Sequence, residues 1–217
     1  MLKIENVNAF GFEAAIRGMR NSWSSWDKSD SYWNFPEGYA YIIGKEDMKL
    51  CSKLIKAGPE HRKFLRFIHI QMDITAPMHF LMEFDTYKVS TNSNGTSKMH
   101  KLLAKPFEPS DFSVVNPKET REYWVRTIDF LNVLRDKYIL THDFNYWRQI
   151  LDLLPCSYNQ TRTWDGSMET VLSMLKQRKG HKLEEWSTFR QECFEKIPYC
   201  LAFYDSLTNN EKVSENM

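Results

Sequence analysis

The chain has 217 residues, of which 42% are apolar and 14% aromatic, so it is long enough to bury a sizeable core and too apolar for the disordered class. Its 29 basic and 28 acidic residues give a formal charge of +1, which excludes a global basic footprint for duplex nucleic acid. We therefore expect no nucleic-acid partner, although local basic pockets remain possible. No stretch approaches the roughly eighteen consecutive apolar residues of a membrane span, and the opening Met1-Leu2-Lys3-Ile4-Glu5-Asn6 lacks the apolar region of a signal peptide. We expect a cytoplasmic protein without a membrane partner.

The first 58 residues mix Trp, Tyr and polar residues with little periodicity, and residues 17–38 are predicted to form an ordered loop region. This region contains an aromatic group that can stack on a planar ligand or pack in a core or interface, and packing is the preferred interpretation. The group consists of Trp23, Trp26, Tyr32 and Trp33. Residues 47–57 have a short helical pattern, which Gly58-Pro59 ends.

A strand is predicted from Ile68 to Thr75, because apolar and polar residues alternate there as in a half-buried strand. Ala76-Pro77 ends this strand, and residues 78–88 are predicted to form a helix with Pro77 near its first turn. A polar stretch rich in turn-forming residues follows at 90–97, before the basic Lys98-Met99-His100-Lys101.

The second half of the chain is predicted to be helical. Apolar residues recur at spacings of three and four over 124–138, and similar patterns indicate helices at 143–154, 168–179 and 183–196. No internal repeat or linker interrupts the chain, so we expect one domain over residues 1–208 and a disordered polar tail at 209–217.

The chemistry is predicted to lie after the strand, where a polar loop brings Tyr87, Lys88 and Lys98 close together. Loop N–H groups and hydroxyls can line an anion site, and lysines add positive charge, so a phosphate group is the expected ligand. The alternative is an ordinary solvated loop after a helix. The four cysteines (Cys51, Cys156, Cys193 and Cys200) have no metal-ligand spacing, so we expect free thiols, buried or partly buried, and no metal.

Two blocks of sequence carry a family resemblance. In the first, Pro59-Glu60-His61-Arg62-Lys63-Phe64 resembles the proline-acid-histidine stretch before a core strand in flavin-dependent thymidylate synthases. The signature of that family is Arg-His-Arg, two residues, Ser, one residue, Asn, two residues, Ser, one residue, Arg. Laid on this chain without gaps, the signature falls on Thr86, Tyr87, Lys88, Thr91, Ser93, Thr96 and Lys98. Lys88, Thr91, Thr96 and Lys98 are conservative replacements, whereas Thr86 and Tyr87 replace the opening Arg and His.

The second block resembles a later part of the same family. It runs from Leu154-Pro155 and Tyr158 to the stretch Met174-Leu175-Lys176-Gln177-Arg178, followed by His181 and Glu185. Arg178 falls on an arginine that helps to hold the flavin in the family. Pro198-Tyr199 through Phe203 resembles the closing segment.

The resemblance implies an α+β fold, with a central, mostly antiparallel sheet flanked by helices and a helical second half. It also implies methylation of a pyrimidine nucleotide, dUMP to dTMP or a related one, by a bacterial or phage homotetramer. FAD is the implied cofactor, with methylenetetrahydrofolate and NADPH as co-substrates, and no side-chain nucleophile is needed. The implied cofactor-binding residues are His61, Tyr87, Lys88, Thr91, Ser93, Arg178 and His181, and the implied substrate-binding residues are Thr96, Ser97 and Lys98.

Two acidic residues oppose this assignment. Glu83 and Asp85 would repel a phosphate unless a cation such as Lys88 or Arg20 pairs with them. The alternatives to an enzyme are a non-catalytic nucleotide- or flavin-binding homologue, or a structural protein that uses its Trp-rich first forty residues as a contact surface. The sequence leaves the substrate, the redox donor and the oligomeric state open.

Overall fold

The computed structural model describes residues 2–36, 40–114 and 118–208, except for the side chains of Lys98 and His100. By its internal contacts the chain divides into two compact units. Unit 1 comprises Met1–Lys3, Ile74–Thr86 and Asn94–Thr163, and unit 2 comprises Ile4–Asp73, Tyr87–Ser93 and Trp164–Met217. One domain over residues 1–208 stays a prediction, and the predicted tail at 209–217 lies outside the described residues.

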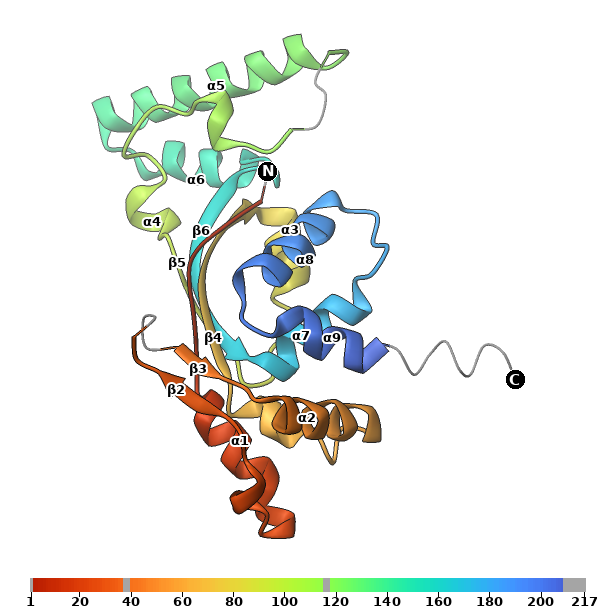
Figure 1. Cartoon of the computed structure of the whole chain (residues 1–217). Helices are drawn as coiled ribbons and strands as arrows, with labels where there is room; N and C mark the ends of the chain where they lie inside the picture. Colours follow the sequence, from red (N-terminus) through yellow and green to blue (C-terminus); the bar gives the residue numbers. More distant parts are fainter. Residues whose placement is uncertain (1, 37–39, 115–117, 209–217) are drawn as a thin grey trace. The chain divides into compact units, whose positions relative to one another are not determined.

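A four-stranded sheet has the order β1-β4-β6-β5, and each of its strands contributes residues to both units (Figure 1). The strands are β1 (Lys3–Phe10), β4 (His69–Pro77), β5 (Asn92–Gly95) and β6 (Asn159–Ser167). Between β1 and β4, Asn6 Nδ2 donates to Asp73 Oδ2 at 2.7 Å, and the Phe10 ring stacks on His69 with centroids 5.5 Å apart. The residue numbers of these partners change in opposite directions, so β1 and β4 are antiparallel.

β4 confirms the strand predicted from alternation, because Ile70, Met72 and Ile74 are all at most 1% exposed. It is also antiparallel to β6. The Met168 N–H, which follows β6, donates to the Ile68 carbonyl at 2.8 Å in unit 2. The Met78 N–H, which follows β4, donates to the Tyr158 carbonyl at 2.9 Å in unit 1.

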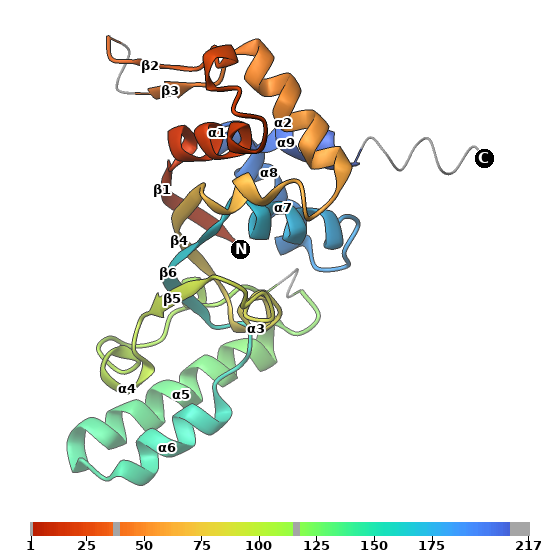
Figure 2. The same ribbon diagram turned by 90° about the horizontal axis from the view of Figure 1, so that it is seen from below.

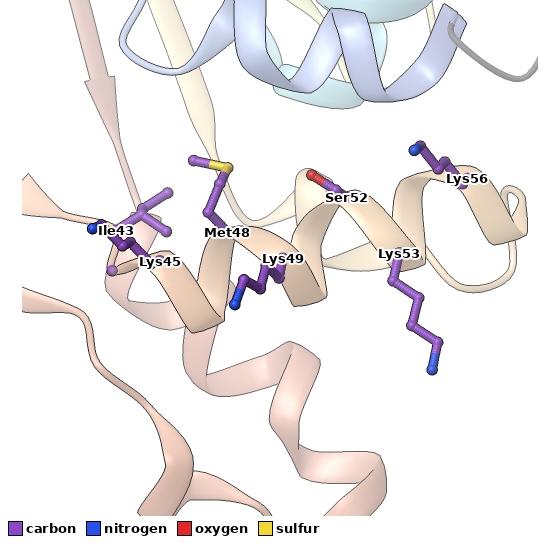
Figure 3. Close-up of a pocket in the computed structure, with 8 residues that line it drawn as sticks. Ile43, Lys45, Met48, Lys49, Ser52, Lys53 and Lys56 are labelled. Carbon is purple, nitrogen blue, oxygen red and sulfur yellow. The ribbon is translucent and has the colours of Figure 1, made fainter.

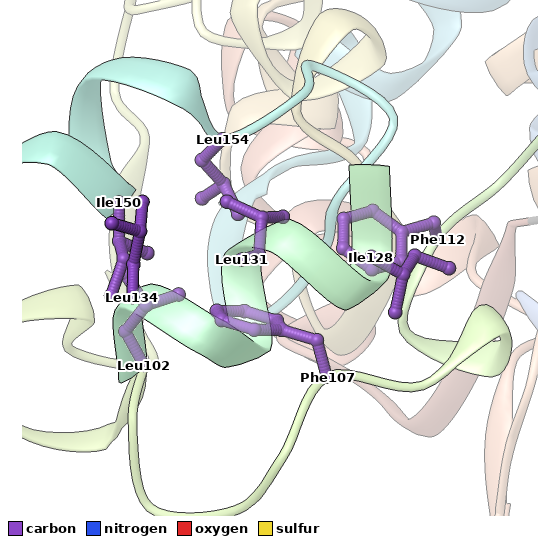
Figure 4. Packing of buried hydrophobic residues seen from close by; sticks show 8 residues of the cluster. All are labelled: Leu102, Phe107, Phe112, Ile128, Leu131, Leu134, Ile150 and Leu154. Atoms are coloured by element: carbon purple, nitrogen blue, oxygen red, sulfur yellow. The ribbon is translucent and has the colours of Figure 1, made fainter. Parts of the chain in front are cut away.

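Unit 1 contains the helices α3 (Met78–Phe84), α4 (Lys98–Lys101), α5 (Arg121–Thr141) and α6 (Phe144–Leu153), and the 3-10 turn η4 (Pro109–Asp111). Helices α5 and α6 lie side by side (Figure 1). They bury a cluster that we call the unit 1 core, shown in Figure 4: Leu102, Phe107, Phe112, Ile128, Leu131, Leu134, Ile150 and Leu154. The apolar residues that predicted both helices are thus the ones that pack.

Unit 2 contains the remaining elements (Figure 2). These are α1 (Phe12–Arg20), η1 (Asn21–Trp23), η2 (Trp26–Lys28), β2 (Tyr32–Asn34), β3 (Ala40–Ile42), α2 (Lys45–Ala57), η3 (Lys63–Arg66), α7 (Met168–Gln177), α8 (Glu184–Lys196) and α9 (Cys200–Thr208). Strands β2 and β3 form an antiparallel pair, and α9 packs against α2, α7 and α8. Among the described residues, no helix is both long and apolar enough to cross a membrane.

The prediction of a loop region over residues 17–38 is wrong for residues 17–20 and 32–34, and residues 37–38 lie outside the described residues. Helix α1 covers its first residues, and β2 lies near its end. The helix starts after Gly11, whose φ of 90° is left-handed and where a Cβ atom would lie 2.1 Å from the Phe67 carbonyl oxygen. Only glycine fits that approach of two backbones.

The prediction that the aromatic group of this region packs in a core is also wrong. Trp23 is 78% exposed, and Trp26, Tyr32 and Trp33 are all at least 42% exposed. Trp33 stacks on Phe35 and donates from Nε1 to the Glu13 carboxylate at 3.1 Å. Whether this surface serves as an interface stays a prediction.

A buried ion pair holds this region to α2. Asp47 of α2 is 0% exposed and Arg20 of α1 is 4% exposed, and Arg20 Nε donates to Asp47 Oδ1 at 2.6 Å. The other carboxylate oxygen accepts hydrogen bonds from Ser29 Oγ and from both the N–H and the hydroxyl of Ser31. Every charge in this buried group therefore has a partner, as burial of a charge requires.

The described cysteines are free thiols, as predicted. Cys51, Cys193 and Cys200 are buried as expected, whereas Cys156 is exposed, so the expected burial is wrong for that residue. Burial raises the pKa of Cys51 and of Cys200 to about 12 each, and it raises the pKa of Cys193 well above its ordinary value.

Candidate functional site

The loop between α3 and β5 belongs to unit 2 from Tyr87 onward, and its own hydrogen bonds shape it. Thr91 Oγ1 donates to the Tyr87 carbonyl at 3.1 Å, and Ser90 has a left-handed φ of 54°. Thr170, in the first turn of α7, donates from Oγ1 to the Val89 carbonyl at 3.3 Å. The loop is thus tied to α7 and holds Tyr87 half-buried.

The other side of this site is the end of α7. Arg178 caps the helix, and its N–H donates to the Met174 carbonyl at 2.9 Å. Gly180 has a φ of 72°, a left-handed conformation that glycine adopts without strain. The chain turns there, and the His181 N–H donates to the Arg178 carbonyl at 3.2 Å. The turn brings His181 beside Arg178.

The Arg178 side chain lies among aromatic rings. Its Nε donates to the Tyr87 hydroxyl at 3.0 Å, and its guanidinium carbon lies 4.9 Å from the centroid of the buried Trp186 ring of α8. Its Nη1 lies 3.2 Å from Nε2 of His181. We call Tyr87, Arg178, His181 and Trp186 the Arg178 cluster, and all four belong to unit 2. The ring contacts hold the guanidinium plane in place.

The hydrogen bonds of His181 set what the cluster can bind. The Leu183 N–H lies 3.2 Å from His181 Nδ1 and Arg178 Nη1 lies 3.2 Å from His181 Nε2, and both of these partners can only donate. A neutral imidazole has one acceptor nitrogen, so His181 can accept only one of the two hydrogen bonds. The Tyr87 hydroxyl accepts from Arg178, so its own hydrogen is available for donation. A hydroxyl donor beside a fixed positive charge is an arrangement that suits an anion.

Thr96 and Ser97 line a separate cavity of about 160 Å³ in unit 1, together with Leu102 and the start of β6 at Tyr158–Thr161. The Thr96 N–H donates to the Thr161 carbonyl at 3.0 Å, and Gln160 Nε2 donates to the Thr96 carbonyl at 2.8 Å. These bonds fix one wall of the cavity. Sites for whole drug-sized ligands are about 300–1,000 Å³, so this cavity fits one end of a nucleotide.

No protein-family model matches the sequence, and no curated protein matches it. Solved structures do match the fold. Thymidylate Synthase X (ThyX) from Helicobacter pylori, solved with FAD and dUMP, has a TM-score of 0.72 at 16% identity, over 96% of this chain and 100% of that chain. A second ThyX structure from the same organism, also with FAD and dUMP, has a TM-score of 0.70 at 16% identity, over 94% of this chain and 100% of the other.

The chain has the ThyX fold. A UMP/dUMP methylase, PolB from Streptomyces cacaoi bound with 5-Br dUMP, also matches, with a TM-score of 0.67 at 13% identity over 96% of this chain and 95% of that chain. The α+β class and the antiparallel sheet expected from the sequence are confirmed.

Within the ThyX fold, the predicted site residues separate into groups. Tyr87, Arg178 and His181 come together, and Thr91 fixes the loop that carries Tyr87. Lys88, Ser93 and His61 are exposed, and no contact with Arg178 is recorded for them among the described residues. Lys98 begins α4, but its side chain lies outside what the structure describes. Of the predicted cationic site residues whose side chains the structure describes, Lys88 and Arg178, only Arg178 belongs to the cluster.

The acidic residues are paired differently from the prediction. Asp85 accepts two hydrogen bonds from Arg162 of β6, at 2.6 and 2.7 Å, both within unit 1. Arg20 pairs with the buried Asp47 and is not available to Asp85. The charge that neutralises Asp85 is thus Arg162, not Lys88 or Arg20, and the repulsion expected from Asp85 is relieved.

The sequence analysis missed Arg162 and Trp186. Arg162 lies in a strand whose sequence, Asn159–Ser167, has almost no apolar residue to mark it. Trp186 lies eight residues after Arg178, and its ring is 1% exposed. A tryptophan in the first turn of the helix that follows a candidate phosphate-binding arginine is a signal that could have found it.

Proposed function

We propose that this chain is a divergent flavin-dependent thymidylate synthase that methylates dUMP or a related pyrimidine nucleotide. In this proposal FAD is the cofactor, methylenetetrahydrofolate gives the carbon, NADPH is the reductant, and the active form is a cytoplasmic homotetramer. The observation that carries the proposal is the Arg178 cluster, in which an arginine from the later sequence block meets a side chain of the signature loop at 3.0 Å.

The residues of the cluster fit the anionic part of a flavin nucleotide. Arg178 supplies a permanent positive charge, and the Tyr87 hydroxyl can add an O–H donor to the same anion. Trp186 and Tyr87 exclude water from one side of the guanidinium, which strengthens its attraction for a phosphate. When bound, the flavin supplies the hydride chemistry that protein side chains lack.

The cavity beside Thr96 and Ser97 is the proposed place for one end of the pyrimidine nucleotide. Its wall of Asn159, Gln160 and Thr161 offers amide and hydroxyl groups that suit a sugar, a base edge or a phosphate oxygen. The ThyX and PolB structures that share the fold were solved with dUMP and with 5-Br dUMP, which supports a nucleotide of this class. The chain's part in the reaction is to orient this nucleotide and to neutralise charge.

The test is conversion of dUMP to dTMP by purified protein with FAD, NADPH and methylenetetrahydrofolate, and rescue of a thymidine-requiring host. We expect the wild type to form dTMP and to rescue, and Arg178→Ala to do neither. Arg126→Ala is the matched control, because Arg126 is 76% exposed and pairs only with Glu122 on the surface of α5 in the recorded contacts. FAD binding without dTMP formation would favour the non-catalytic homologue. Rescue by Arg178→Ala at the wild-type level would contradict the site.

A further inference from the structure

Helix α2 carries a row of lysines with no role in the site described above. Lys45, Lys49, Lys53 and Lys56 are all exposed. At 100° and 1.5 Å per residue, the four lie within about 80° of the helix circumference along roughly 16 Å of its axis. The buried residues of α2 are Asp47, Cys51 and Ile55, on the opposite face.

The charge of this face is unbalanced. Glu46 pairs with Lys49 at 2.6 Å, and the Asp30 carboxylate accepts from the N–H groups of Glu46 and Asp47. Asp47 itself is buried and neutralised by Arg20. Lys45, Lys49 and Lys53 carry three positive charges against Glu46 and Asp30, so this part of the face has an excess of one positive charge.

The arrangement also lowers the stability of the helix. Lys45 with Lys49 and Lys49 with Lys53 are like-charge pairs at i,i+4 spacing, which destabilise a helix. Lys45 stands at the positive end of the helix dipole, where a cation is disfavoured. An anion bound among these side chains would relieve both repulsions.

The lysines surround an open pocket of about 710 Å³, a volume typical of small-molecule sites. Met48 and Ile43 give it an apolar part, and Ser52 shares a hydrogen bond with Ser206 of α9. Figure 3 shows Met48 and Ser52 on one side of α2 and the long side chains of Lys49 and Lys53 extending away from the helix. Lysine binds phosphate as a point charge and needs no fixed geometry, unlike the arginine fork, which binds carboxylate or phosphate through two parallel hydrogen bonds.

We propose that the α2 pocket binds a small ligand that carries several phosphate groups, at a site that shares no residue with the Arg178 cluster. A compact ligand is favoured over a long polymer, because the positive charge lies around one pocket and the whole chain has a formal charge of only +1. The ammonium groups hold the phosphates, and Met48 and Ile43 contact the uncharged part of the ligand. The proposal is independent of flavin binding and of methylation.

The experiment is calorimetric titration of the full-length protein with inorganic tripolyphosphate at low salt, with orthophosphate for comparison. We expect saturable tripolyphosphate binding with a dissociation constant below about 1 mM, weaker binding of orthophosphate, and loss of affinity as salt is raised. Lys49→Gln combined with Lys53→Gln should weaken binding by about tenfold or more. Lys28→Gln combined with Lys63→Gln removes two exposed lysines outside the pocket and should change it less than about twofold.

Two further measurements distinguish the α2 pocket from the Arg178 cluster and from a surface that binds a nucleic-acid polymer. In an Arg178→Ala background, which removes tripolyphosphate binding at the Arg178 cluster, saturable binding should persist and should still be weakened by Lys49→Gln combined with Lys53→Gln. Oligothymidylate should compete poorly with tripolyphosphate. The proposal would be overturned by an absence of saturable binding, or by an equal loss of affinity in the two lysine double variants. It would also be overturned by complete loss of binding in Arg178→Ala, or by oligothymidylate binding to α2 without tripolyphosphate binding.

Discussion

Two kinds of buried polar residue differ in what they do for the molecule. The Arg20–Asp47 pair connects α1 to α2 through a carboxylate whose oxygens are all hydrogen-bonded. The buried thiols of Cys51 and Cys193 make no such network and behave as small apolar groups. The Arg20–Asp47 pair contributes to stability through its charges, whereas the buried thiols contribute through packing.

Asp47→Ala should lower the free energy of unfolding by about 3–5 kcal/mol, because it leaves the buried Arg20 without its counter-charge. Urea unfolding followed by circular dichroism measures this change. Asp152→Ala is the control, since Asp152 pairs with Arg148 on the surface of α6, and it should cost less than about 1 kcal/mol. Similar losses in the two variants would show that the buried pair is not a support of the fold.

Alkylation of the native protein with iodoacetamide near neutral pH should modify Cys156 and leave the other three cysteines intact. Cys156 is exposed, whereas burial removes access to Cys51, Cys193 and Cys200 and raises the pKa of each thiol, so little thiolate exists. Peptide mass spectrometry identifies the modified residues. Modification of Cys193 as fast as Cys156 would contradict the burial of α8 against its neighbours.

At the scale of elements, the sequence predicted those helices and strands whose apolar residues recur with a regular period. Alternation identified β4, and repeating apolar positions identified α2, α5, α6, α7 and α8, each within a few residues of its observed bounds. The predicted helix at 78–88 ends at Phe84, so Tyr87 belongs to the loop. Strand β6 was missed because its nine residues bury only Trp164, Gly166 and Ser167, which leaves no alternation to read.

The turn after α7 tests whether the backbone conformation of Gly180 positions His181 beside Arg178. Gly180→Ala should cost about 1 kcal/mol of stability, because alanine disfavours the φ of 72° although nothing lies within 4 Å of the new Cβ. It should also weaken anion binding by displacing His181. Gly18→Ala is the contrasting control, since Gly18 lies inside α1 and its Cβ would lie 3.6 Å from the Phe67 ring. That variant should gain about 0.5–1 kcal/mol. Thermal unfolding of both variants measures the signs, and a stabilising Gly180→Ala would contradict the account of this turn.

At the scale of the whole molecule, the fold was predicted from a family resemblance. That resemblance lies in the spacing and polarity of residues more than in their identity. The matches to ThyX structures at 16% identity confirm the α+β architecture over 96% of the chain. The candidate site was only partly predictable. Tyr87, Arg178 and His181 come from two distant blocks that the sequence singled out. Trp186 and Arg162 carry roles that depend on tertiary contacts, which no local pattern encodes.

Tyr87 stands where the sequence resemblance leads one to expect a histidine. The tyrosine hydroxyl accepts the Arg178 Nε–H, and its ring lies 5.6 Å from the guanidinium carbon. Tyr87 therefore gives Arg178 a partner from the loop after α3. The lysine row of α2 lies outside this network and adds a second positively charged surface to a chain of nearly neutral charge.

The central claim is that the Arg178 cluster binds the anionic part of a flavin, and titration of purified protein with FAD, followed by flavin fluorescence, tests it most directly. The wild type and Arg126→Ala should bind FAD equally. Arg178→Ala should weaken binding by about 10- to 100-fold, and Tyr87→Phe, which keeps the ring but loses the hydroxyl, by about three- to tenfold. A wild type that binds no FAD, or an Arg178→Ala variant that binds it as tightly as the wild type, would contradict the claim.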